Sequence, residues 1–77
     1  MPKSLVFSPK KLLKILLKKD FYIHHQTGSH VNLRHNYKNN LHVVIPYHGR
    51  DLATKTLKSI LLQADLTEED LRINLNK

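Results

Sequence analysis

The chain has 77 residues, 40% of them hydrophobic, with no cysteine and a formal net charge of +7 at pH 7. This length suits one domain with a thin core, so we expect a single domain over residues 1–77. The missing cysteines exclude disulfides and thiolate chemistry, and no apolar run approaches the roughly 18 residues that a membrane span needs. Residues 1–11 lack the apolar stretch of a signal peptide, so we expect a soluble, cytoplasmic protein with no membrane partner.

The positive charge is concentrated in the first part of the chain. Residues 1–64 hold eleven Lys and Arg against two Asp and Glu, whereas residues 65–77 hold two against four. A basic body favours phosphate polymers, because each neutralised phosphate releases counterions. The composition therefore favours nucleic-acid binding over the alternative, a basic surface that only aids solubility.

In chain order, the sequence predicts one helix, three strands and two more helices. Ser8 and Pro9 are typical of a helix start, and leucines at helical spacing continue the pattern to Lys19. Alternating apolar and polar residues predict strands, and Asn, Gly and Ser residues predict the turns between them. The expected elements are a helix over 9–19, strands over 21–26, 30–35 and 41–45, a helix from 52 or 53 to 64, and a short helix capped by Thr67.

This order, α-β-β-β-α with a short C-terminal helix, indicates the α+β class. Three antiparallel strands joined by short turns can bury one face under two helices and leave the other face in solvent. On the second strand, Val31 and Leu33 would face the helices. His30, Asn32 and Arg34 would then face solvent, because successive side chains of a strand alternate between its faces.

Six histidines raise the question of a metal site: His24, His25, His30, His35, His42 and His48. The chain has no cysteine, no histidine pair four residues apart on an expected helix, and no zinc-finger spacing. We therefore expect no metal and no other cofactor. Each histidine also has a structural interpretation; the adjacent His24 and His25 should lie on opposite faces of their strand, one packed and one in solvent.

His30 differs from the others in its neighbours, because it follows a Gly-Ser turn and shares a face with a cation. An imidazole can take and give a proton near neutral pH, and RNA supplies its own nucleophile, the 2′-hydroxyl. The protein need only move protons and stabilise the charged phosphorane with Lys or Arg. Candidate phosphate contacts are Lys10, Lys14, Arg34, His48 and Lys55, although each is also compatible with a plain solvated surface residue.

Three stretches together resemble the HicA family, the toxin half of HicA–HicB toxin–antitoxin modules. They are SPKKLLKILLKKDFYIHHQTGSH, then VIPYH after the third strand, and TLKSILLQADLTEEDL near the end. The resemblance covers roughly residues 8–71, which it implies to be the core of the domain, and it implies a double-stranded-RNA-binding-like fold. It also implies an mRNA interferase, a metal-independent endoribonuclease that cleaves RNA, inhibits translation and is neutralised by a HicB-type antitoxin.

The resemblance places the catalytic histidine at His30, with Gly28 and Ser29 as the supporting turn. Two positions depart from the pattern of many members: Val31 stands where a second histidine is common, and His25 stands where the first strand often carries arginine. The second proton-transfer group is therefore open between His24, His48 and solvent.

Two other functions stay open from the sequence. A non-catalytic RNA-binding module of the same fold would recognise A-form RNA by its shape, through phosphates and 2′-hydroxyls. The start of the last long helix offers such a module only Lys55 and Lys58. A pure protein-interaction domain would instead show no salt-sensitive RNA binding.

Overall fold

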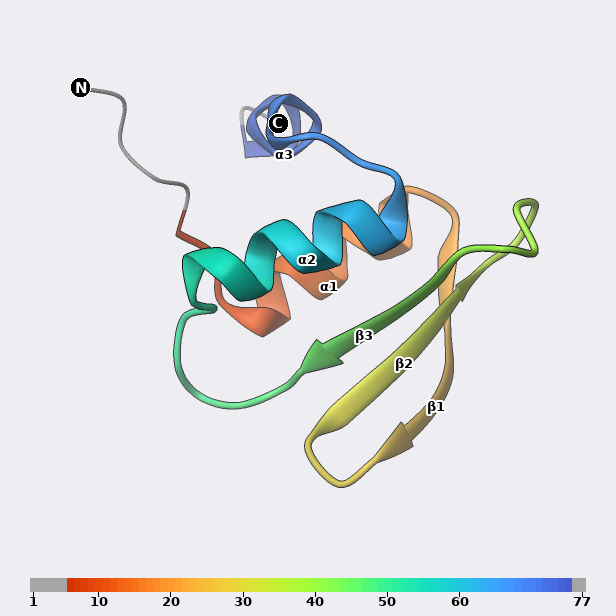
Figure 1. Ribbon diagram of the computed structural model, residues 1–77, viewed down its shortest axis with the longest axis horizontal. Coiled ribbons are helices and arrows are strands. Elements are labelled where there is room, and N and C mark those ends of the chain that lie inside the picture. The colour runs from red at the N-terminus through yellow and green to blue at the C-terminus, as the bar shows by residue number, and fades with distance from the viewer. Residues whose placement is uncertain (1–5, 76–77) are drawn as a thin grey trace.

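Residues 6–75, the part of the chain that the computed structural model describes, form three helices and one three-stranded antiparallel sheet (Figure 1). The elements are α1 (Pro9–Lys18), β1 (Phe21–Thr27), β2 (His30–His35), β3 (His42–Pro46), α2 (Thr54–Ala64) and α3 (Glu68–Leu75). This confirms the α-β-β-β-α order and the α+β class. The third strand lies one residue later than expected, α2 begins one or two residues later, and the expected domain bounds 1–77 reach beyond the described residues at both ends.

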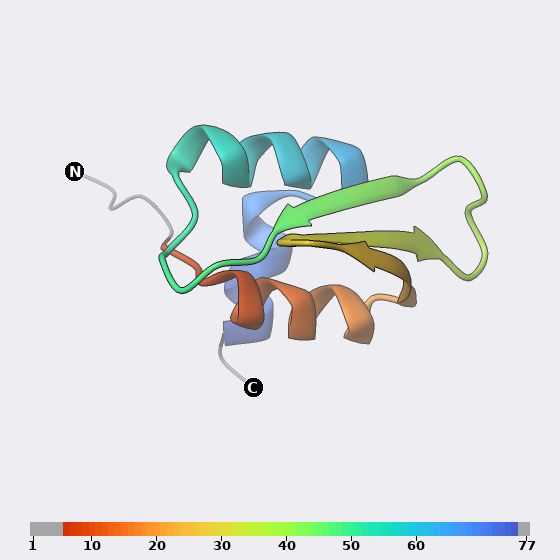
Figure 2. The same ribbon diagram turned by 90° about the horizontal axis from the view of Figure 1, so that it is seen from below.

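The elements are arranged in layers. α1 and α2 run in nearly the same direction on one face of the sheet, with α2 packed on β3 and α1 mainly on β1 (Figures 1 and 2). α3 lies on the side of these two helices that is away from the sheet (Figure 1). None of the helices in residues 6–75 combines the length and hydrophobicity that crossing a bilayer requires.

The sheet has β2 at its centre, so both hairpins contribute to each face. Directly opposite residues of antiparallel strands point to the same side, so the strand register assigns the residues of each face. We call the face away from the helices the open face. It carries Tyr22, His25 and Thr27 from β1, His30, Asn32 and Arg34 from β2, and His42, Val44 and Pro46 from β3.

The other face of the sheet forms the core. Val31 and Leu33 are 2% and 0% exposed, and Val43 and Ile45 beside them on β3 are fully buried, which confirms the alternation predicted for the second strand. Two stripes at helical spacing cover them: Leu12, Ile15 and Leu16 from α1, and Leu57, Ile60, Leu61 and Ala64 from α2. Phe7, one residue before the expected core, is also buried.

The outer edge of β3 explains how a proline can end this strand. The backbone N–H of Val44 donates to Gln63 Oε1 of α2 at 3.0 Å, so it points away from β2. Pro46 lies two residues further and therefore turns its nitrogen to the same outer side. Because that position needs no ladder hydrogen bond, the edge strand tolerates a residue without an N–H.

The first strand contains an irregularity that the sequence analysis did not predict. The register of β1 against β2 shifts between Ile23 and His25, so His24 is an extra residue in a β-bulge. Both His24 and His25 are exposed, and their Nδ1 atoms lie 2.9 Å apart. The expectation that one of them packs and the other is solvated is wrong, because the bulge interrupts the alternation of faces on which it rested.

Candidate active site on the open face

The candidate site begins at the tight turn between β1 and β2. Gly28 has φ +57°, whereas Ser29 is not among the residues with positive φ, a combination typical of a two-residue type II′ hairpin turn. Thr27 and His30 pair directly across this turn. The turn therefore makes His30 the first residue of the central strand.

The backbone around His30 is held from both sides. His30 lies between Thr27 of β1 and Pro46 of β3, and the N–H of Tyr47 donates to the carbonyl of Ser29. The side chain of His30 itself is exposed. An imidazole on a fixed backbone that solvent can reach is suited to proton transfer with a bound ligand.

Arg34 shares the open face with His30 but lies further along the strand. It is four residues away, which is about 13 Å at about 3.3 Å per residue. Asn32 lies between them, and its Oδ1 is 3.3 Å from Nε2 of His42. His30 and Arg34 are therefore placed to contact different parts of one extended ligand.

The lysines predicted as phosphate contacts are not brought to the open face. Lys10 and Lys14 are exposed on α1, and Lys55 is exposed in the first turn of α2, so all three lie on helices that cover the other face of the sheet. They remain on a different surface from His30. Of the predicted contacts, only Arg34 shares its face.

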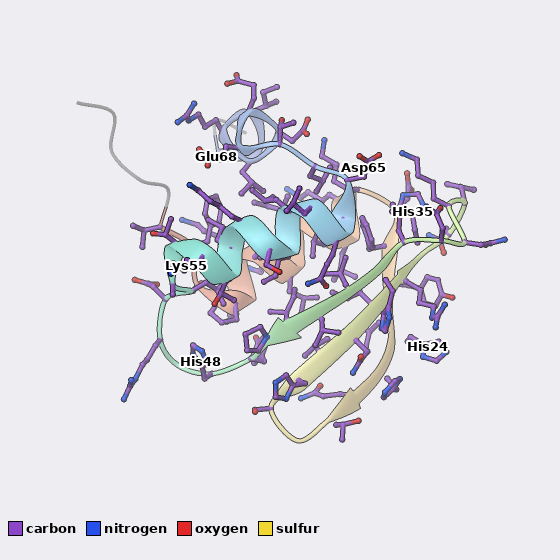
Figure 3. The ribbon with its side chains drawn as sticks, viewed as in Figure 1. His24, His35, His48, Lys55, Asp65 and Glu68 are labelled. Carbon is purple, nitrogen blue, oxygen red and sulfur yellow. The ribbon has the colours of Figure 1, made fainter. Side chains whose placement is uncertain are left out.

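Two of the six histidines accept hydrogen bonds from the backbone of a loop through their Nδ1 atoms. His35 Nδ1 accepts the backbone N–H groups of Tyr37 and Lys38 at 3.0 Å each, so His35 organises the β2–β3 loop. His48 lies in the loop between β3 and α2, where its Nδ1 accepts the N–H of Arg50 at 3.2 Å. Figure 3 shows His48 at the end of the molecule where α2 begins and His24 on the outer side of β1.

The ion pairs of the described residues do not involve the cations predicted to contact phosphate. Asp65 pairs with Lys38 at 3.8 Å, and Arg72 lies 3.7 to 3.9 Å from Glu69 and Glu68 of α3. Among residues 6–75, by contrast, Lys10, Lys14, Arg34 and Lys55 form no ion pair. These cations therefore stay available for an anionic ligand. Over the same range, no group of three or more His, Cys, Asp or Glu side chains is arranged to hold a metal ion.

The family model described as the HicA toxin of bacterial toxin-antitoxin matches residues 9–66. The chain belongs to the HicA toxin family. Curated protein sequences give no match to it. The range matched to the HicA model contains the Gly28–Ser29 turn and His30, whereas α3 follows after it.

Sequence analysis alone did not place Tyr22 and His42 beside Arg34, which they flank on the open face. The only signal for them in the sequence is the alternation within their own strands. That alternation does not say which residue of β2 lies opposite, because the register depends on pairing between strands.

Proposed function

We propose that this HicA-family protein is an mRNA interferase, a metal-independent endoribonuclease in which His30 acts as general acid or base. One observation carries the proposal: an exposed imidazole lies at the first residue of the central strand, fixed by the Gly28–Ser29 turn. The unpaired cations and the net charge of +7 support a polyanionic substrate.

The reaction follows from the chemistry of RNA. A base takes the proton of the 2′-hydroxyl, the 2′-oxygen attacks the neighbouring phosphorus, and the bond from phosphorus to the 5′-oxygen breaks. An acid returns a proton to the 5′-oxygen, so the products are a 2′,3′-cyclic phosphate and a 5′-hydroxyl. His30 supplies one of the two proton transfers.

Two further imidazoles are candidates for the other transfer. His48 follows Pro46, the cross-strand neighbour of His30, by two residues. His24 contacts the ring of His25, which lies on the open face opposite Asn32. A single variant, His24→Ala or His48→Ala, should remove one limb of the pH–rate profile if that imidazole is the partner of His30.

The partner protein of this function is a HicB-type antitoxin that neutralises the toxin by covering His30. The strongly basic body favours an acidic antitoxin surface, because complementary charge speeds association and fixes the binding orientation.

The decisive experiment replaces His30 with alanine. His30→Ala should abolish RNA cleavage and growth inhibition, because the imidazole that moves the proton is gone. Since His30 is exposed, the free energy of unfolding should change by no more than about 0.5 kcal/mol. Cleavage of a labelled RNA and thermal unfolding measure the two effects, and Tyr37→Ala, in the exposed β2–β3 loop, is the matched control.

Wild-type protein incubated with RNA in EDTA separates the alternatives. Cleavage in EDTA supports the metal-independent nuclease. RNA binding without cleavage would indicate a non-catalytic RNA-binding module, and the absence of salt-sensitive binding would indicate a protein-interaction domain. Cleavage by His30→Ala at the wild-type rate would contradict the assignment of His30.

A further inference from the structure

We infer that the open face binds the RNA as a single strand that runs along β2, with its reacting phosphate at His30 and a second phosphate at Arg34. This inference rests on the proposed nuclease function. It adds that the substrate is a single strand, and it names the residues that bind this strand at a distance from the reacting bond. Tyr22 and Arg34 are the residues that carry it.

The register arranges the open face in three cross-strand rows. The rows are Thr27–His30–Pro46, then His25–Asn32–Val44, then Tyr22–Arg34–His42. Along β2, successive rows lie two residues apart, which is about 7 Å. The spacing between phosphates of an extended single strand is of the same size, so neighbouring nucleotides match neighbouring rows.

Arg34 has the environment of a cation that lacks its anion. It is half-buried, its Nε is shielded from solvent, and this atom has no hydrogen-bond partner. Arg34 also forms no ion pair within residues 6–75. A partly buried guanidinium is costly to leave unpaired, and a phosphate at its other nitrogens would supply the missing charge.

The distribution of carboxylates is compatible with an anionic ligand on the open face. None of the nine open-face residues is Asp or Glu. Glu68, Glu69 and Asp70 lie instead on α3, beyond the helices that cover the other face (Figures 1 and 3). A polyanion on the open face is therefore kept away from the acidic end of the chain.

Tyr22 favours a single strand over a duplex. This residue is 41% exposed beside Arg34, and an exposed ring can stack on an unpaired base but not on one inside a duplex. The cleavage reaction also favours a single strand, because an A-form helix does not hold the 2′-oxygen in line with the leaving 5′-oxygen. A flexible single strand can adopt that alignment.

The test measures binding of a fluorescein-labelled 2′-O-methyl oligonucleotide, which cannot be cleaved, by fluorescence anisotropy. The single strand should bind more tightly than the same strand annealed to its complement. Tyr22→Ala should weaken single-strand binding about tenfold, which corresponds to about 1.4 kcal/mol of stacking, whereas Tyr22→Phe should retain it. Tyr37→Ala, at a ring 77% exposed in the β2–β3 loop, is the matched control.

Arg34→Gln tests the second phosphate contact. It should weaken binding and lower the slope of log affinity against log salt by about 0.7, the value for one neutralised phosphate of a single strand. Arg72→Gln, whose partners are the carboxylates of α3, should change neither quantity. Thermal unfolding of each variant confirms that the fold is intact, and Tyr22→Ala tests the path independently should Arg34→Gln fail to fold.

The outcomes separate this inference from the proposed function. If the wild type cleaves unmodified RNA while the Tyr22 and Arg34 variants bind the single strand normally, the path along β2 is wrong and the nuclease stands. Equal or tighter binding of the duplex also overturns the path. Variants that keep RNA affinity but lose affinity for a HicB-type antitoxin would make the open face a protein interface instead. If the wild type cleaves no RNA, the proposed nuclease itself is wrong.

Discussion

At the scale of single residues, the position of His30 depends on the backbone of Gly28. Its φ of +57° lies in a region that residues with a side chain adopt only with strain, and no atom crowds the place where a Cβ would stand. The reason for glycine is therefore conformational and not a close contact. The residue sets the direction in which the chain enters β2.

Gly28→Ala should destabilise the protein by about 1–2 kcal/mol and reduce RNA cleavage, because the strained turn shifts the start of β2. Urea unfolding and a cleavage assay measure the two effects. Gly49→Ala is the control, since Gly49 has no positive φ and an equally open surrounding. Equal stability of the two variants would contradict the role assigned to the turn.

At the scale of elements, α3 begins with a reciprocal cap. The N–H and hydroxyl of Thr67 donate to Asp70 Oδ2 at 2.8 and 3.0 Å, and the N–H of Asp70 lies 3.3 Å from Thr67 Oγ1. This confirms the cap predicted at Thr67. The hydrogen bonds from the Thr67 backbone and hydroxyl, and to a lesser extent the charge of Lys19, hold the pKa of Asp70 below its usual range.

This pKa shift predicts a pH dependence of stability. A lowered pKa in the folded state means that the Asp70 carboxylate stabilises the fold above the ordinary aspartate value of about 4. The contribution is lost as the pH falls through the lowered pKa. Wild type should therefore melt higher than Asp70→Asn at pH 7, and the difference should shrink below about pH 4; a constant difference across this range would contradict the cap.

At the scale of the whole molecule, residues beyond the matched family range complete the core. The match ends at residue 66, yet Leu71 of α3 is fully buried with the side chains of the sheet and the other helices. Phe7, which precedes α1, is also buried in this core, and its carbonyl accepts the N–H of Leu52 at 2.8 Å. Both ends of the described chain therefore hold the helical layer that supports the open face.

Leu71→Ala should cost about 2–5 kcal/mol, because it removes a buried side chain and leaves a cavity. Leu62→Ala is the matched control, since Leu62 is 83% exposed on α2 and should change the free energy of unfolding by no more than about 0.5 kcal/mol. Thermal unfolding compares the two. Similar melting temperatures would show that α3 adds little to the stability of the fold.

The sequence by itself determined the order of the elements, the two faces of β2 and the caps at Thr67 and at Ser8, whose hydroxyl oxygen accepts the N–H of Lys11. These features depend on residues a few positions apart, through the periods of 2 and 3.6 and through local hydrogen bonds. The position of His30 after its turn followed in the same way, since a Gly-Ser turn is also a local signal.

Only the tertiary structure decided which side chains meet on the open face. The bulge at His24, the row that joins Tyr22 to Arg34 and His42, and the bond from Val44 to Gln63 each require contacts between separate elements. A shift of one residue in register would turn each strand over while leaving its sequence pattern unchanged. Pairing between strands and packing of the helices on one face set that register, because a one-residue shift of β2 would expose Val31 and Leu33.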